Sequence, residues 1–135
     1  MNNAETTNDY LKSYMKNILI IDDDSRNIFA LSAVLKAKGF QSNAASCMEE
    51  AFAMLHGNHS VDVILIDMMM PGMDGYEAIP KLKNTKELKC IPVVAVTAQA
   101  MKGDREKCLA VGADGYVSKP VDVDLLLNVL KSFVK

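Results

Sequence analysis

The sequence predicts an α/β domain with a doubly wound parallel sheet of five strands and helices on both faces of the sheet. Three short apolar runs have the texture of strands that are buried on both faces, at residues 18–21, 61–66 and 91–96. Between these runs, apolar residues recur every three or four positions, which indicates amphipathic helices. Strand and helix alternate five times, and this order favours parallel strands joined by right-handed crossovers.

The first helix is predicted directly after the opening strand. Ile28, Leu31 and Leu35 share one helical face. Asp24, in Asp24-Ser25, is suited to begin this helix because an aspartate side chain accepts hydrogen bonds from the first backbone N–H groups. Gly39 is suited to end it because glycine adopts a left-handed conformation without strain.

A weaker strand at residues 40–45 and a second helix come next. Apolar residues recur at helical spacing between positions 48 and 55. Ser46 and Glu49 lie three positions apart just ahead of this pattern, and this spacing predicts a capping box.

The third helix is expected in the segment GYEAIPKLK, which contains Pro80. A proline inside a helix removes one hydrogen bond and crowds the carbonyl four residues earlier, here that of Tyr76. The helix is therefore expected either to start late or to bend at this point.

The last two helices flank the fifth strand, which is predicted at residues 115–118. The fourth helix is more polar, covers Lys102–Val111 and is closed by Gly112. The fifth helix begins at Asp122 as N-cap, and its apolar face contains residues 126, 129, 130 and 133.

Composition and charge narrow the kind of protein. Half of the 135 residues are apolar, which suits one folded domain, predicted at residues 17–135 behind a polar tail or linker at residues 1–16. The formal net charge of -2 argues against direct nucleic acid binding and against attachment to anionic membranes. No apolar run reaches the ~20 residues that cross a bilayer, and no signal-peptide pattern is present, so a cytoplasmic location is expected.

Several residue groups have a simple structural explanation. Cys47, Cys90 and Cys108 lack metal-ligand spacing and are expected to be reduced and buried. Met68-Met69-Met70 is expected to fill loop and core, and the lysines between positions 81 and 89 are expected to form a solvated surface.

Polar side chains come directly after four of the five predicted strands. The first strand ends in Asp22-Asp23-Asp24, the third in Asp67, the fourth in Thr97-Ala98 and the fifth in Ser118-Lys119-Pro120. The carboxyl ends of parallel strands meet at one edge of the sheet, which is where such folds build their sites. Each residue alone has a structural explanation, but their convergence predicts a functional site.

These groups fit the chemistry of phosphoryl transfer. Clustered carboxylates need a compensating cation, and oxygen ligands suit Mg²⁺ or Mn²⁺. An aspartate can attack phosphorus and form an aspartyl phosphate, while a metal ion, a lysine and hydroxyl donors neutralise the transferring group. Asp67, the acidic pair, Thr97 and Lys119 could supply this set.

Four segments closely resemble the receiver domain of two-component response regulators: ILIIDDDSRN (18–27), ILIDMMMPGMDGYEA (64–78), VVAVTAQA (93–100) and GADGYVSKP (112–120). The resemblance covers residues 17–135 and includes the spacing of Asp67, Thr97 and Lys119. It implies a flavodoxin-like (βα)5 fold with strand order 2-1-3-4-5.

The resemblance also implies a role for each matched residue. Asp67 is the expected phosphoacceptor, and Asp67, Asp22, Asp23 and the backbone carbonyl of Met69 are the expected metal ligands, with Asp22 acting mainly through water. Lys119 is expected to contact the phosphoryl oxygens, and its peptide bond to Pro120 to be cis.

The resemblance further implies a switch that acts on partners. Thr97 would move toward the phosphoryl group, Tyr116 would turn inward, and the face formed by residues 102–111, 115–118 and 122–133 would change its preferred downstream protein. The expected donor is a phosphohistidine on a sensor histidine kinase or histidine phosphotransfer protein. The chain would be a monomer or weak dimer and a self-phosphorylating acceptor with slow autophosphatase activity, not a turnover enzyme.

Two further expectations concern the lifetime of the aspartyl phosphate and the kind of protein in which this receiver occurs. Met69 and Gln99 flank the expected phosphoryl site, and an apolar Met69 should order an attacking water poorly, which predicts an aspartyl phosphate that lasts minutes or more. The chain resembles both stand-alone regulators and receivers of hybrid kinases.

Three alternatives to a receiver share parts of this pattern. A haloacid-dehalogenase-type phosphatase would use the two-residue spacing of Asp22 and Asp24 but leaves Asp67 unexplained. A flavodoxin-like FMN carrier needs a glycine- and hydroxyl-rich loop in place of DDDSRN. A pseudo-receiver would lack the acceptor or the lysine.

Overall fold

The computed structural model describes residues 16–57, 60–98 and 102–133, and residues 1–15 of the tail predicted at residues 1–16 lie outside this range. Its centre is one parallel sheet with the strand order β2-β1-β3-β4-β5, as predicted. The strands are β1 (Asn17–Ile21), β2 (Gln41–Ala45), β3 (Val63–Asp67), β4 (Val93–Thr97) and β5 (Gly115–Ser118). The described helices are α2 (Ser25–Ala37), α3 (Met48–His56), α4 (Gly75–Lys83), α5 (Asp104–Ala110) and α6 (Val123–Lys131).

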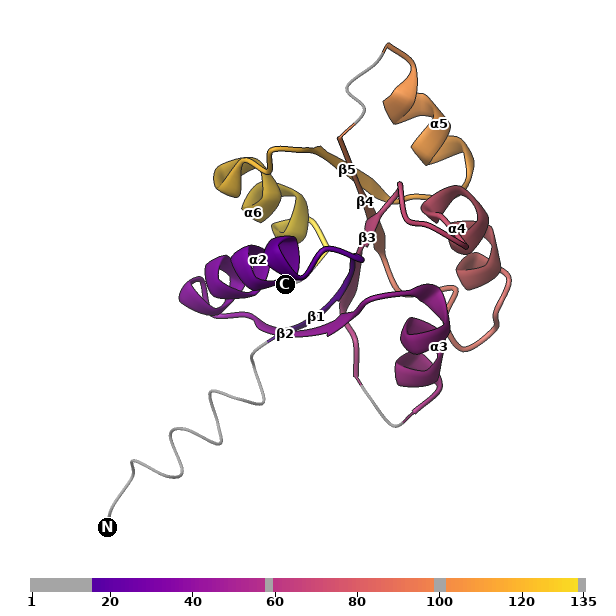
Figure 1. Ribbon diagram of the computed structural model, residues 1–135, viewed down its shortest axis with the longest axis horizontal. Coiled ribbons are helices and arrows are strands. Elements are labelled where there is room, and N and C mark those ends of the chain that lie inside the picture. The colour runs from indigo at the N-terminus through magenta and orange to yellow at the C-terminus, as the bar shows by residue number, and fades with distance from the viewer. Residues whose placement is uncertain (1–15, 58–59, 99–101, 134–135) are drawn as a thin grey trace.

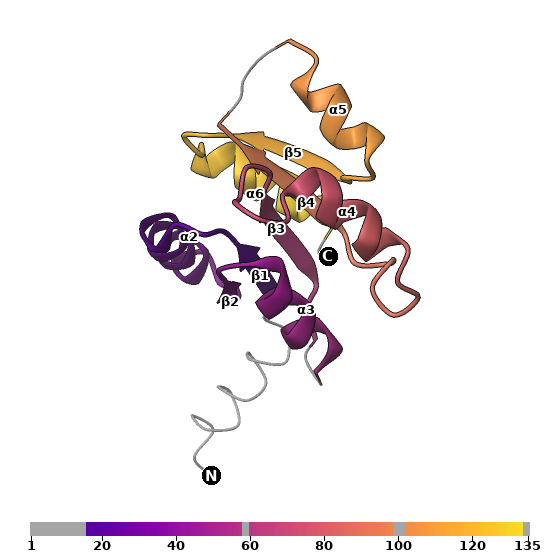
Figure 2. The same cartoon turned by 45° about the vertical axis from the view of Figure 1, so that its right-hand side comes forward.

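Helices cover both faces of the sheet (Figure 1), and alternate strand residues belong to the cores on the two faces. On one face, Leu19 and Ile21 belong to a core that includes residues of α3, α4 and α5. On the other face, Ile18 and Ile20 belong to a core that includes residues of α2 and α6. The turned view in Figure 2 shows α2 on the opposite side of the strands from α4. The apolar runs read from the sequence are therefore strands buried on both sides.

The helix ends agree with the sequence in most places. Asp24 caps α2, and Asp122 caps α6 by accepting from the backbone N–H groups of Asp124 and Leu125. After α2, Gly39 has a φ of +90°, and the backbone N–H of Phe40 returns to the carbonyl of Leu35 at 2.9 Å. This is a Schellman-type end, as expected for a glycine at that position.

The predicted capping box at Ser46 and Glu49 is wrong. The N-cap of α3 is Cys47, whose side chain makes no capping bond. Ser46 instead donates from its backbone N–H and its hydroxyl to the carboxylate of Glu50, at 3.2 and 3.3 Å. The helix begins one residue later than the pattern suggested, so the acid that faces Ser46 is also one residue later.

Three predicted boundaries shift for identifiable reasons. β3 begins at Val63 rather than residue 61, since Asp62 caps the strand start by accepting from the backbone N–H of Asn17 at 2.8 Å. β4 begins at Val93 because Pro92 has no N–H to donate. α5 begins at Asp104 rather than residue 102 because Gly103, with a φ of +90°, precedes it as N-cap.

Pro80 lies inside α4, which nevertheless begins at Gly75 behind its N-cap Asp74. The alternative of a late start is therefore wrong. Gly75 permits this start because a Cβ atom there would lie 2.9 Å from the Cα atom of Met68 and would overlap its side chain. Only glycine lets α4 begin this close to the loop after Asp67.

Two expectations need correction, one about the burial of the cysteines and one about the solvation of the lysines. Cys108 is buried as predicted, but Cys47 and Cys90 are exposed, because neither lies on an apolar helix face. Lys83 is not simply solvated: its Nζ atom lies 2.6 Å from Asp114 and 3.1 Å from the carbonyl of Ile91. Met68 and Met70 are buried core residues, whereas Met69 is 49% exposed.

Candidate functional site

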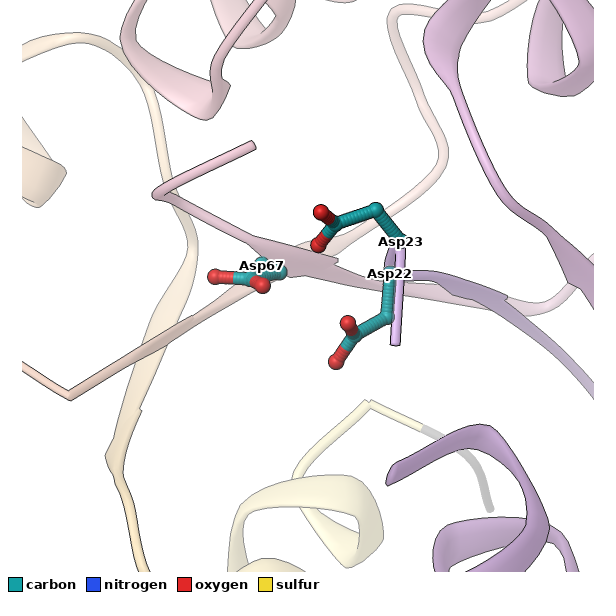
Figure 3. A group of neighbouring side chains, drawn as sticks. All are labelled: Asp22, Asp23 and Asp67. Carbon is teal, nitrogen blue, oxygen red and sulfur yellow. The ribbon is translucent and has the colours of Figure 1, made fainter. Parts of the chain in front are cut away.

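Three carboxylates gather where β1 and β3 end. Oxygen atoms of Asp22, Asp23 and Asp67 all lie within 4.8 Å of one another. Figure 3 shows the side chains of Asp22 and Asp23 extending from the end of β1 toward Asp67 at this edge of the sheet. Asp22 and Asp67 are buried, with 2% and 7% of their surface exposed, whereas Asp23 is exposed. Because like charges at partly buried positions repel one another, this arrangement favours a bound cation.

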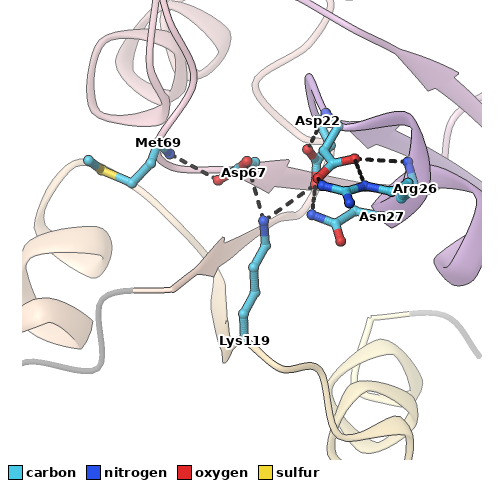
Figure 4. A network of polar contacts seen from close by, with 7 residues as sticks. Asp22, Arg26, Asn27, Asp67, Met69 and Lys119 are labelled. Atoms are coloured by element: carbon cyan, nitrogen blue, oxygen red, sulfur yellow. Dashed lines mark hydrogen bonds and ion pairs between the residues drawn. The ribbon is translucent and has the colours of Figure 1, made fainter.

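Asp22 is oriented by neighbouring donors (Figure 4). Its Oδ1 atom accepts from the backbone N–H of Asp24 at 2.9 Å, and its Oδ2 atom accepts from the side-chain amide of Asn27 at 3.4 Å. The Nζ atom of Lys119 lies 3.5 Å from the same Oδ2. These contacts fix the direction of the carboxylate without a bound ion.

Asp67 lies between one backbone donor and one ammonium group. Its Oδ1 atom accepts from the backbone N–H of Met69 at 3.0 Å, and its Oδ2 atom lies 3.3 Å from the Nζ atom of Lys119. Burial nevertheless raises the pKa of Asp67 above its ordinary value, with Asp22 adding to the rise and Met69 and Lys119 opposing it. The ionised side chain is thus incompletely stabilised by the protein alone, and a nearby cation would correct this.

Thr97 and Lys119 reach the same edge from β4 and from the end of β5. Asp67 pairs with Val96 in the sheet, so Thr97 lies one residue further along the neighbouring strand. Thr97 is fully buried, and its carbonyl accepts from the backbone N–H of Lys119 at 2.7 Å. The Lys119–Pro120 peptide bond is cis, as the resemblance implied. The predicted site residues are therefore brought to one sheet edge.

The carboxylate group fits a small, hard cation. Two ligands on opposite sides of Mg²⁺ are about 4.2 Å apart, because each metal–oxygen distance is about 2.1 Å. The three carboxylate oxygens are separated by at most 4.8 Å, so a small side-chain adjustment would satisfy this distance. Within residues 16–57, 60–98 and 102–133, no other group of three Asp, Glu, His or Cys side chains meets this spacing.

Asp24 has a different role from its two neighbours in the acidic run. It caps α2 through the backbone N–H of Arg26 at 2.9 Å, and its carboxylate lies 3.3 Å from the guanidinium of the same residue. The hydrogen bond from the Arg26 side chain lowers the pKa of Asp24. The carboxylate is therefore committed to a helix end, and the phosphatase-type use of Asp22 with Asp24 gains no support.

Tyr116, the expected switch aromatic, lies on β5 and packs partly buried against the core under α3, α4 and α5. Its hydroxyl donates to Oδ2 of Asp104 at 2.9 Å, and the hydroxyl of Tyr76 donates to Oδ1 of the same carboxylate at 2.9 Å. Asp104 is 5% exposed.

The chain matches one known protein family over most of its length. The family model of the response regulator receiver domain matches residues 18–131. The chain belongs to this family. Membership implies phosphorylation-based two-component signalling, in which receiver domains act as switches and not as turnover enzymes.

Individual relatives and solved structures match this chain over most of its length. The polar-differentiation response regulator DivK of Brucella ovis is 34% identical over 119 residues, which cover 88% of this chain and 96% of that protein. The chemotaxis protein CheY4 of Vibrio cholerae matches with a TM-score of 0.80 at 28% identity, over 88% of this chain and 98% of that chain. The receiver domain of a sensor histidine kinase from Pseudomonas aeruginosa PAO1 matches with a TM-score of 0.80 at 28% identity, over 89% and 98% of the two chains. That structure has a magnesium ion coordinated in its active site cleft.

Sequence reasoning assigned no role to three residues near the predicted site and switch. Asn27 is five positions from Asp22, and its amide could have been noted as a donor on the first turn of α2. Tyr76 and Asp104 are 28 positions apart and meet only because α4 and α5 lie close together, so no local sequence pattern predicts their contact. Gln99, named with Met69 as flanking the phosphoryl site, lies outside the described residues.

No helix in the part of the receiver domain that the structure describes is both long and apolar enough to pass through a bilayer.

Proposed function

We propose that Asp67 of this receiver domain accepts a phosphoryl group from a phosphohistidine on a sensor histidine kinase or histidine phosphotransfer protein. The observation that carries the proposal is the buried Asp67 carboxylate placed between two further carboxylates and the Lys119 ammonium. A carboxylate oxygen attacks phosphorus while the phosphorus–nitrogen bond of the donor breaks. The imidazole nitrogen keeps the electron pair and takes up a proton, and the product is an aspartyl phosphate.

Asp22, Asp23 and Asp67, with the backbone carbonyl of Met69, would hold Mg²⁺ or Mn²⁺. The metal ion, when bound, neutralises charge on the phosphoryl oxygens and on the acceptor. Lys119 is already within 3.5 Å of both Asp22 and Asp67, so its ammonium can follow the new charge without leaving the site. Asn27 holds Asp22 in the direction that this arrangement needs.

Phosphorylation would be transmitted through Thr97 and Tyr116. Thr97 lies buried at the end of β4, and its hydroxyl would donate to a phosphoryl oxygen on the adjacent strand. Tyr116 lies on the next strand, opposite Ala95 in the register. Its reorientation would alter the surface formed by α5, β5 and α6, where a downstream protein would bind. A few kcal/mol of differential interaction suffices for such a population shift.

The aspartyl phosphate is expected to persist for minutes or more. Met69 lies two residues after the acceptor, and its half-exposed apolar side chain has no group to activate an attacking water. Loss of the phosphoryl group after labelling with acetyl phosphate measures this lifetime, and decay within seconds would contradict it.

The decisive experiment is incubation with acetyl phosphate and Mg²⁺, followed by intact mass measurement. The wild-type protein should gain one phosphoryl group, and Asp67→Asn should gain none. Asp74→Asn is a matched control because Asp74 caps α4, a position where asparagine serves equally well. A phosphoryl adduct on Asp67→Asn, or none on the wild type, would overturn the proposal.

A further inference from the structure

Asp104, the first residue of α5, is a buried acid that joins three elements of the fold. Its carboxylate accepts one hydrogen bond from the hydroxyl of Tyr76 on α4 and one from that of Tyr116 on β5, each at 2.9 Å. Only 5% of its surface is exposed. The contact therefore connects α4, α5 and the fifth strand on the side of the sheet away from α2 and α6.

Two hydroxyl donors provide what a buried carboxylate needs. A buried acid without donors is strongly disfavoured, and hydrogen bonds to a charged acceptor are about twice as strong as neutral ones. Burial, followed by the hydrogen bond to Asp104, raises the pKa of Tyr116 to about 12. The same causes, in the same order, raise the pKa of Tyr76. Both hydroxyls thus remain protonated donors at neutral pH.

The contact restricts the residue expected to move. Tyr116 pairs with Ala95 in the sheet, and Thr97 lies two residues further along β4, so the side chains of Tyr116 and Thr97 project from the same sheet face. Asp104 is fixed from a second direction by Tyr76. In the proposed switch the Tyr116 ring moves, and because Tyr76 holds Asp104 in place, that movement would break the hydrogen bond between Tyr116 and Asp104.

We propose that Asp104 is a positioning residue for the switch: through its hydrogen bonds to Tyr76 and Tyr116, it holds the β5 aromatic ring in the orientation of the unphosphorylated state. The proposal rests on the proposed function, because it assigns Asp104 a place in that switch. The strength of this contact sets how much of the active conformation exists before phosphorylation, so weakening it favours the phosphorylated state.

The test is titration with beryllofluoride, a phosphoryl mimic, at saturating Mg²⁺. Fluorotyrosine labelling reports on the chain's four tyrosines by fluorine NMR, and the Tyr116 signal is assigned by its loss in Tyr116→Phe. Asp104→Asn should lower the beryllofluoride concentration at half-saturation by on the order of tenfold, the effect of losing one hydrogen bond to a charged group. In this variant, the Tyr116 signal should already be shifted toward its bound position before beryllofluoride is added.

Two variants separate positioning from general stabilisation. Tyr116→Phe removes only the hydroxyl and should lower the half-saturation concentration in the same direction, read from the remaining tyrosine signals. The double variant should change little beyond either single one, because both remove the same contact. Tyr76→Phe removes the second hydrogen bond to the same carboxylate but leaves that of Tyr116, so its half-saturation concentration should fall in the same direction but by less than in Tyr116→Phe.

The outcomes distinguish the two proposals. If the wild-type protein binds beryllofluoride while Asp104→Asn and Tyr116→Phe bind it equally well or more weakly, the positioning role is wrong and the phosphoacceptor role stands. If the wild-type protein shows no Asp67-dependent binding of beryllofluoride, the proposed function itself fails.

Discussion

Two buried acidic regions of this receiver domain are built on opposite principles. At the ends of β1 and β3, three carboxylates, from Asp22, Asp23 and Asp67, lie together, and one lysine ammonium, that of Lys119, contacts two of them, Asp22 and Asp67. At the start of α5, one carboxylate, that of Asp104, accepts from two tyrosine hydroxyls. The first region has an excess of like charge, whereas the second has one charge with two matched donors.

The contrast separates a site that needs a ligand from a contact that stabilises the fold. Burial raises the pKa of Asp67 in spite of its two favourable contacts, so its charged form is a cost that a bound cation removes. Asp104 has 2.9 Å hydrogen bonds to both oxygens, so its carboxylate is satisfied by the protein itself. Burial alone does not distinguish an acid that could bind a ligand from one that positions other side chains, and the number and charge of its neighbours must be counted.

Loss of the Lys119 ammonium should have the largest effect of the changes considered, and it should act on the rate of phosphorylation. Lys119→Ala is expected to slow phosphorylation by acetyl phosphate by about 100-fold, the usual cost of removing one preorganised electrostatic donor. Lys83→Ala is the matched control, because Lys83 also pairs with an aspartate, at 2.6 Å, but outside the acidic cluster. Intact mass measurement gives the rate of phosphorylation by acetyl phosphate. Equal slowing of Lys119→Ala and Lys83→Ala would contradict the prediction.

Neutralising one acid in each region should change stability in opposite directions. Without divalent cations at neutral pH, Asp67→Asn should raise the free energy of unfolding, since a raised folded pKa means that the charged form destabilises the fold. This penalty should shrink as pH falls through the folded pKa of Asp67. Asp104→Asn should lower the free energy of unfolding by about 1–3 kcal/mol, because a tyrosine hydroxyl loses its charged acceptor.

Urea unfolding measures both variants, with Asp74→Asn as a conservative control at a helix cap. A loss of stability in Asp67→Asn would mean that its pair with Lys119 outweighs burial and the repulsion from Asp22.

Magnesium should act on the first region alone. At a Mg²⁺ concentration tenfold above its dissociation constant, the free energy of unfolding should rise by about 1.4 kcal/mol in the wild type. Asp104→Asn should keep this gain, whereas Asp23→Asn should lose most of it, because Asp23 is one of three clustered carboxylates and lies at the surface. An equal gain in all three proteins would place the bound ion elsewhere.

The smallest expected effect concerns alkaline pH and the second region. The pKa of Tyr116 is about 12 in the folded protein because of burial and the hydrogen bond to Asp104, against about 10 in an unfolded chain. The stabilisation from the neutral hydroxyl is complete below about pH 10 and is lost as pH rises through the folded pKa. Tyr116→Phe should reduce the decline in unfolding free energy across this window by on the order of 1 kcal/mol. Urea unfolding at pH values below and within this range measures the effect. An equal decline of the unfolding free energy in the wild type and in Tyr116→Phe would contradict the prediction.

The edge of the sheet at which the carboxylates meet was predictable from the sequence. Apolar runs that end in Asp22 and in Asp67 identify two strand ends, and parallel strands bring such ends to the same edge. The cap at Asp24 was predictable from its position ahead of a helical pattern. The boundary at Val93 was missed because the apolar pattern continues through Pro92, whose missing N–H decides where the ladder starts.

The sequence by itself determined the alternation of strands and helices, the edge that gathers the acids and the residue types available there, because these depend on periodicity and on the residues that come directly after each strand. Only the tertiary structure decided which acid joins the carboxylate cluster, which caps a helix and which is held by Tyr76 and Tyr116. The physical reason is that a carboxylate's role depends on partners from other elements, whose distance along the chain carries no information about their distance in space.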